Sequence, residues 1–147
     1  MEKQTVYKVL HEDEHRLVSS CVDKRWQIEY YIDVFSPWIK PKDPDSYIFA
    51  FESLEEALSF YYRLKRFDDY EYAVYEIWEC KARGVVPAPE YVVNLIFNKR
   101  REIKKFWKLF NRGASIEEIK ERVKNVNVRV PDGTVLCKEI MLIRKVY

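Results

Sequence analysis

Two histidines and the acids between them form the first candidate for chemistry in this chain. The run from His11 to His15 has the H-E-x-x-H spacing. It binds zinc when a helix places both imidazoles on one face, with Glu12 beside them as the general base. The run lies between two strand-like segments, its flanks are polar, and the chain contains no other histidine. We therefore predict that residues 11–15 form a solvated hairpin loop and that no metal is bound there.

A dense group of basic residues is the second candidate. Residues 99–112 contain seven bases and one acid, Glu102, a net charge of +6, whereas the whole chain carries only +2. Residues 43–79 contain ten acids and three bases, a net charge of −7. Charge is therefore segregated along the chain. The candidate binding residues are Arg100, Arg101, Lys104, Lys105, Lys108 and Arg112.

Helical spacing places these bases opposite an apolar stripe that contains Ile103, Trp107 and Phe110. Such a basic face is suited to neutralising phosphates or an acidic protein, with salt-sensitive affinity. A neighbouring aromatic such as Phe97 would supply an apolar anchor for a protein partner. The alternative is a solvated helix face, partly paired with the acidic segment. Membrane binding is disfavoured, since the core needs the apolar stripe.

The carboxylates and thiols predict no catalytic centre of their own. Glu76 and Glu79 point to opposite faces of a strand, so they do not form an acid–base pair. The three cysteines (Cys21, Cys80, Cys137) are far apart and fall in predicted strands, as expected of buried, inert thiols. Only three glycines are present, which argues against a phosphate-cradling glycine loop. We expect no cofactor.

The candidate residues lie on helices and strands whose expected order along the chain predicts a single α+β domain over residues 1–147. It has a mainly antiparallel, twisted sheet, two packed amphipathic helices and a C-terminal β-hairpin. The helices are expected at residues 53–66 and 90–112, and the hairpin turn at Pro131-Asp132-Gly133. Ser53 with Glu56 and Ser115 with Glu118 form capping boxes. The expected strands cover residues 5–11, 16–22, 26–35, 47–51 and 72–81.

The chain shows neither a signal peptide nor an apolar run of about 18 residues, the length that spans a bilayer. A cytoplasmic location is therefore expected. The order of segments resembles small proteins of thermophilic archaea and their viruses. The resemblance lies in VYKVL (6–10), YIFAFESLEEALSFY (47–61) and PDGTVLCKEIMLIRKV (131–146). It implies a hot setting, cellular or viral, and no particular activity.

A more distant resemblance is to the ADP-ribosyltransferase-like fold. It lies in the strand–helix unit FESLEEALSF (51–60) and the strand YEIWEC (75–80). The resemblance implies that Glu139 is a catalytic acid in a cleft with Tyr7, Tyr30 or Tyr31. Tyr7 or Lys8 would then stand where the family holds its nicotinamide cofactor with arginine or histidine. The chain departs from the family at residues 51–53, which read Phe-Glu-Ser in place of a Ser-Thr-Ser pattern.

The leading hypothesis is a small, non-enzymatic interaction protein that binds a protein or nucleic acid through residues 99–112. An ADP-ribosyltransferase-like enzyme, or an inactive relative of one, is the first alternative. A minor structural protein is the second, since abundant aromatics and few glycines are compatible with it.

Overall fold

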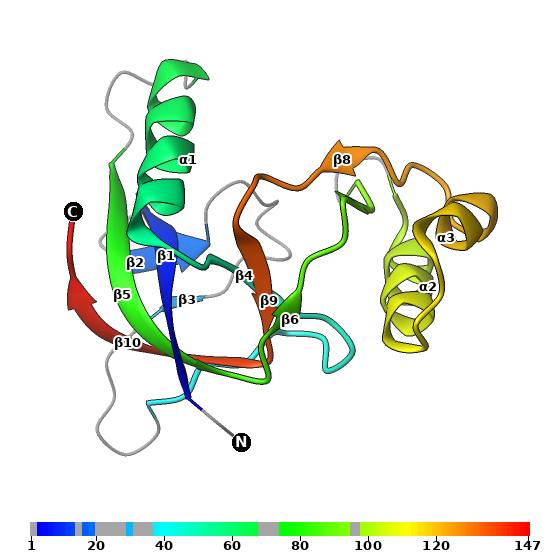
Figure 1. The fold of residues 1–147 in the computed structure, drawn as a ribbon, viewed down its shortest axis with the longest axis horizontal. Coiled ribbons are helices and arrows are strands. Elements are labelled where there is room, and N and C mark those ends of the chain that lie inside the picture. Colours follow the sequence, from blue (N-terminus) through cyan, green and yellow to red (C-terminus); the bar gives the residue numbers. More distant parts are fainter. Residues whose placement is uncertain (1–2, 14–15, 20–28, 31–36, 68–73, 95–97) are drawn as a thin grey trace.

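The computed structural model describes residues 3–13, 16–19, 29–30, 37–67, 74–94 and 98–147 (Figure 1). The fold is α+β, with a mostly antiparallel sheet, as the sequence predicts. Its helices are α1 (Leu54–Phe67), α2 (Arg100–Asn111) and α3 (Ile116–Arg122). Its strands are β1 (Gln4–Asp13), β2 (Arg16–Ser19), β3 (Glu29–Tyr30), β4 (Ile48–Phe51), β5 (Tyr75–Arg83), β6 (Val86–Pro87), β7 (Tyr91–Val92), β8 (Val128–Arg129), β9 (Thr134–Cys137) and β10 (Glu139–Lys145).

The large sheet is strongly curved. Its strand order is β10-β5-β1-β4-β9-β6, and every pair is antiparallel. Strands β9 and β10 are consecutive, separated only by Lys138, yet one pairs with β4 and the other with β5. The bend at Lys138 faces Gly84, whose φ is +62° and whose Cα approaches so closely that a Cβ would lie 2.9 Å from the Lys138 Cβ. Glycine is required there because a side chain would collide.

Alternating side chains fill the inside of this curved sheet, as the period of a strand dictates. Buried apolar residues come from five strands and from Ile39, which forms an isolated bridge with Ile140. We call this group the sheet core; it comprises Val6, Leu10, Ile39, Ile48, Ala50, Cys80, Ala82, Val135, Cys137, Ile140 and Leu142. Lys8 also lies in β1 and is 8% exposed, and its Nζ donates to the Phe49 carbonyl oxygen at 2.6 Å. A buried ammonium needs such a partner.

Helix α1 covers the outer face of β1, β4 and β5. Its buried residue Ala57 packs with Val9, Phe51 and Ile77, one from each of those strands. The Ser53 Oγ accepts from the Glu56 backbone N–H at 3.2 Å and donates to the Glu56 carboxylate at 2.9 Å. The predicted cap is therefore present and fixes where the helix begins.

Helices α2 and α3 form a second layer, on the other side of β9 from α1 (Figure 1). Their shared cluster, the lobe core, reaches the sheet through Leu136 of β9 and Phe49 of β4. It comprises Val93, Ile103, Phe106, Trp107, Leu109, Ile119, Val123, Val126 and Leu136. No helix within the described ranges is long and apolar enough to cross a membrane.

The structure corrects the prediction of one long helix over residues 90–112. Residues 91–92 are strand β7, and the helix begins only at Arg100. Strand β7 pairs with β8, with Tyr91 opposite Arg129. Tyr91 and Val92 pack against the lobe core from strand β7. Over so short a length the spacing of apolar residues does not distinguish a strand from a helix.

The predicted C-terminal hairpin is also wrong, although its turn is present. The Thr134 N–H donates to the Pro131 carbonyl oxygen at 3.2 Å, and Gly133 has a φ of +80°. The strand before the turn pairs with β7 and the strand after it with β4 and β6. The turn therefore joins two sheets instead of two neighbouring strands, because each flanking strand finds a longer-range partner.

The N-terminal meander is confirmed where the structure describes it. Strand β1 pairs with β2 from Leu10 to Asp13, and β2 pairs with β3 through Leu17 and Tyr30. Much of the predicted strands at 16–22 and 26–35 lies outside the described residues.

Candidate interaction surface on helix α2

Helix α2 lacks a side-chain cap at its amino end, whereas hydrogen bonds define its carboxyl end. Its N-cap residue, Lys99, has extended dihedral angles and makes no side-chain capping hydrogen bond. At its other end Gly113 has a φ of +81°, its N–H donates to the Phe110 carbonyl oxygen, and the Ala114 N–H donates to that of Leu109. These two bonds form a Schellman motif, which ends the helix at a defined residue.

The apolar face of α2 is fully used by the lobe core. Ile103, Phe106, Trp107 and Leu109 are all less than 8% exposed. The centre of the Trp107 ring lies 5.5 Å from the centre of the Tyr47 ring, and Tyr47 is the residue that precedes β4. Because these side chains are buried, the helix can present only its opposite face to a partner.

A chain of polar contacts ties the carboxyl end of α2 to the sheet. Asn111 accepts from the Tyr47 hydroxyl at 2.7 Å and donates to the Asp45 carbonyl oxygen at 2.9 Å. The Lys138 ammonium donates to the carbonyl oxygens of Pro44 and Ser46 and lies 3.8 Å from the centre of the Tyr47 ring. Burial lowers the pKa of Lys138, and the charges of Asp45 and Asp43 oppose that shift. The helix is therefore held at a fixed place on the sheet.

No local pattern reveals this attachment in the sequence, because Asn111 is 64 residues from Tyr47 and Lys138 is 92 from Ser46. Sequence reasoning missed these residues for that reason. One signal could have pointed to Asn111: it is the one uncharged polar residue of a helix that otherwise carries charged and apolar side chains.

All the basic residues from Lys99 to Arg112 are exposed. We call the surface that they form the basic face; it comprises Lys99, Arg100, Arg101, Lys104, Lys105, Lys108 and Arg112. Within the described part of the chain, no ion pair joins any of them to an acid. The nearest acid in sequence, Glu102, accepts instead from the Lys124 backbone N–H at 3.3 Å. The positive charge of this face thus lacks an internal counter-charge among the residues described.

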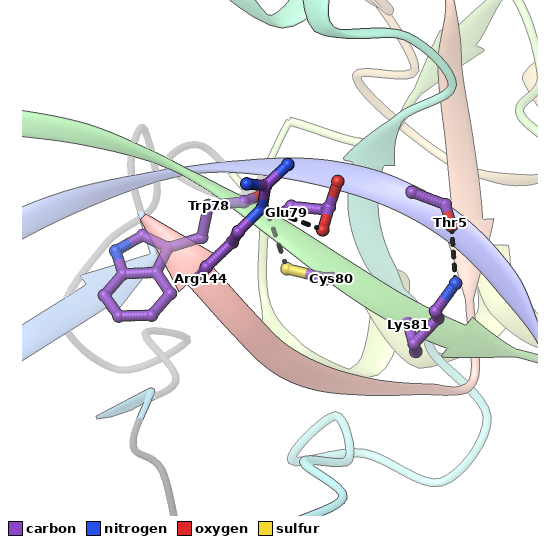
Figure 2. A network of polar contacts seen from close by, with 6 residues as sticks. All are labelled: Thr5, Trp78, Glu79, Cys80, Lys81 and Arg144. Atoms are coloured by element: carbon purple, nitrogen blue, oxygen red, sulfur yellow. Dashed lines mark hydrogen bonds and ion pairs between the residues drawn. The ribbon is translucent and has the colours of Figure 1, made fainter. Parts of the chain in front are cut away.

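The acidic segment 43–79 has other partners where it is described. Glu76 lies 3.2 Å from the Lys145 ammonium, and Glu79 accepts from the Arg144 Nε at 3.2 Å (Figure 2). Both are contacts between β5 and β10, and β10 lies at the opposite end of the strand order from β9, through which the sheet contacts the lobe core (Figure 1). The two oppositely charged segments therefore do not neutralise each other in these contacts.

Glu139, the acid implied by the ADP-ribosyltransferase resemblance, lies between two cations. Its carboxylate oxygens are 3.5 Å from the Lys40 ammonium and 3.6 Å from an Arg83 guanidinium nitrogen. The Arg83 guanidinium also stacks on the Trp38 ring, 3.8 Å from its centre. The negative charge of Glu139 is therefore compensated by two neighbouring cations.

The sheet register keeps Glu139 and Tyr7 apart. Glu139 is opposite Arg83 in β5 and Tyr7 is opposite Glu79, four residues further along the same strand, or about 13 Å. A shallow hollow near the turn at residues 131–133 is lined by Glu90, Arg129 and Thr134 among others, and does not include Glu139. Tyr31 lies outside the described residues, as does the side chain of Tyr30.

The H-E-x-x-H run does not form a helix where it is described, and the predicted loop over residues 11–15 is too long, because residues 11–13 belong to strand β1 and pair with β2. His11 lies in β1, opposite Tyr75 of β5, with the two ring centres 5.2 Å apart. His15 is outside the described residues. Across the described ranges no three histidine, cysteine or acidic side chains gather closely enough to hold a metal ion.

The two described cysteines are buried in the sheet core. Burial raises the pKa of Cys80 and of Cys137 to about 12, and the nearby Lys8 opposes the shift in both. A thiol with so high a pKa stays protonated and unreactive at neutral pH. The prediction of buried, inert thiols therefore agrees with the structure for these two; Cys21 and Phe97 lie outside the described residues.

Comparison with known proteins adds no family to this description. No protein-family model matches the chain, and neither the curated proteins nor the solved structures contain a significant match.

Proposed function

We propose that this protein binds a negatively charged macromolecule through the basic face of α2. The observation that carries the proposal is the unpaired charge of that face: seven exposed bases on and beside one helix, with no acid paired to them in the described structure. A polyanion would supply the missing counter-charges. Its binding would release condensed counterions, so affinity would fall as salt rises.

The position of the bases on the helix also supports a role in binding. Lys99, Arg100 and Arg101 lie at the amino end, where the helix dipole already presents positive charge, and Lys99 is a poor cap. Bases spaced three and four residues apart repel one another along the rest of the face. Both features destabilise the free helix. Residues that lower local stability in this way are expected at functional sites.

The attachment of α2 supports the proposal in a second way. The lobe core and the contacts of Asn111 fix the helix to the sheet before any partner arrives. A preformed binding surface loses less conformational entropy on association than a mobile one. The side chains of the face need only restrict their own rotamers.

The decisive experiment compares two variants with the same net charge. Arg101→Glu/Lys105→Glu reverses two bases of the basic face, whereas Arg63→Glu/Arg66→Glu reverses two exposed bases of α1. Binding to labelled heparin is measured by fluorescence anisotropy at about 50 and 200 mM salt. We expect wild-type affinity to fall steeply with salt. The α2 variant should bind at least about tenfold more weakly at low salt, or roughly 1.4 kcal/mol.

The α1 variant is the matched control and should keep its affinity within about twofold to threefold, since two distant surface charges act only through screened, long-range attraction. Equal losses in both variants would show that only net charge matters. Absence of binding at low salt in the wild-type protein would reject the proposal outright.

A further inference from the structure

Resting on the proposed function, we infer that the polyanion is double-helical DNA, whose phosphates α2 contacts without reading base sequence. Four features of the basic face lead to this partner. They are the absence of exposed aromatic rings from its described part, its single sign of charge, its dimensions, and the internal use of the one amide side chain of α2.

Aromatic rings for stacking are absent from the described part of the basic face. Proteins that bind single-stranded nucleic acid combine basic grooves with aromatic side chains on which bases stack. The rings of α2 are Phe106, Trp107 and Phe110, and all three belong to the lobe core or pack against it. Among the described residues, the large apolar side chains that are exposed lie elsewhere, namely Tyr62, Val74, Val128, Ile143 and Tyr147. A stacked double helix does not need such rings, because its bases face inward.

The single sign of charge argues against an acidic protein as partner. Protein interfaces concentrate their affinity in a few central, apolar or aromatic anchors surrounded by a polar rim. The basic face offers charged side chains over its whole described width and no such centre. A uniform array of phosphates matches a uniform array of bases better than a folded protein surface does.

The dimensions of the face also fit a double helix. From Arg101 to Arg112 the helix rises about 16 Å, a length over which duplex DNA presents about ten phosphates. An α-helix with its side chains is about 10–12 Å wide, and the major groove of B-form DNA is about 12 Å wide. The deep, narrow major groove of an RNA duplex does not admit a helix. DNA is therefore favoured over double-stranded RNA.

The one amide side chain of α2, which could read adenine, is already engaged. Asparagine recognises adenine through both ends of its amide. In this structure both ends of the Asn111 amide are bound internally, to Tyr47 and to Asp45. The remaining side chains of the face are lysines and arginines, to which we assign phosphate contacts that fix position without selecting sequence.

The test measures the affinity of the full chain for five probes at about 50 and 200 mM salt. The probes are two B-form DNA duplexes of unrelated sequence, one of their single strands, an RNA duplex and poly-glutamate. We expect both DNA duplexes to bind equally within about threefold and at least about tenfold more tightly than the other three probes. Arg101→Glu/Lys105→Glu should flatten the dependence of log affinity on log salt by about two units, one for each phosphate that the variant no longer neutralises.

Each other outcome has a defined meaning. Tighter binding to the single strand, to duplex RNA or to poly-glutamate would overturn the DNA inference while leaving the proposed binding face intact, provided that the α2 variant still weakens it. A large preference for one duplex sequence would overturn sequence independence. If no probe binds, or if the α1 variant Arg63→Glu/Arg66→Glu weakens binding as much as the α2 variant, the proposed function itself fails.

Discussion

The basic residues of β10 and those of α2 differ in where their counter-charges lie. Arg144 and Lys145 of β10 each lie 3.2 Å from a glutamate of β5, the strand beside them. The bases of α2 have no such acid within the described chain. Antiparallel pairing places side chains opposite one another and so allows charges to be matched. A helix with seven bases and one acid in and beside it has no such opportunity, which leaves its charge available to a partner.

The largest effect is expected when the support of the basic face is removed. Phe106 is fully buried in the lobe core. Phe106→Ala should lower the free energy of unfolding by about 3–5 kcal/mol, because it removes a ring and leaves a cavity. Urea denaturation followed by tryptophan fluorescence measures this. Val74→Ala, at an exposed position, should stay within about 0.5 kcal/mol of wild type. A decrease below about 1 kcal/mol for Phe106→Ala would show that the lobe core does not hold α2.

The sheet core should respond to pH in a way that the exposed face does not. Burial raises the pKa of Cys80 and Cys137 from 9.0 to about 12. Well below pH 9 the two thiols are protonated in the folded protein and in the unfolded chain alike. Above it the unfolded chain ionises first, so stability is lost as pH rises from about 9 to 12. The decrease should approach about 1.4 kcal/mol per pH unit for each thiol.

Denaturation at several alkaline pH values measures this slope, and the alanine variants isolate each thiol. Cys80→Ala and Cys137→Ala should each reduce the slope, although each lowers stability at neutral pH. An unchanged slope in both variants would mean that neither thiol is buried as described.

Reversing charge on β10 should separate stability from binding. Arg144→Glu/Lys145→Glu places like charges beside Glu79 and Glu76 and should cost about 1 kcal/mol of stability, since exposed pairs contribute little. Its affinity for heparin should stay close to that of wild type. Arg101→Glu/Lys105→Glu has the same net charge and should show the opposite pattern, with weakened binding and nearly unchanged stability. Weakened binding in the β10 variant would contradict this difference between the two regions.

The carboxyl end of α2 offers a test of comparable size. Gly113 has a φ of +81°, and a Cβ there would meet nothing within 4 Å. Gly113→Ala should therefore cost about 1–2 kcal/mol through backbone conformation alone. Gly113→Asn should cost less than alanine, because asparagine tolerates a left-handed backbone. Equal stability of all three proteins in thermal denaturation would indicate that the helix end is not fixed by this motif.

The smallest expected effect is a change in stability on substitution of Lys104, and its sign is informative. Lys104→Glu places an acid four residues from both Arg100 and Lys108, so two repulsive pairs become attractive. Stability should rise by about 0.5–1 kcal/mol, while affinity for heparin falls. A rise in melting temperature together with weaker binding would show that the basic face trades stability for function. Unchanged affinity would instead indicate a merely solvated face.

Much of the fold was predictable because its signals are local. The cap at Ser53, the glycine after α2 and the cap at Ser115 each specify a helix end through contacts within a few residues, and the structure contains all three. The membership of the basic face was predictable for the same reason, since helical spacing alone groups its side chains. The start of α2 was not, because residues 91–92 pair with residues 128–129, which are distant in sequence.

What the sequence determined by itself is the α+β class, the start of α1, the end of α2, the start of α3 and the composition of the basic face. What only the tertiary structure decided is whether that face has internal partners. The register between β5 and β10 places Glu76 and Glu79 in ion pairs with the basic residues of β10. Packing of Trp107 against Tyr47 then turns the apolar side of α2 inward and its bases outward. Counter-charge depends on which strands become neighbours, and only long-range pairing fixes that.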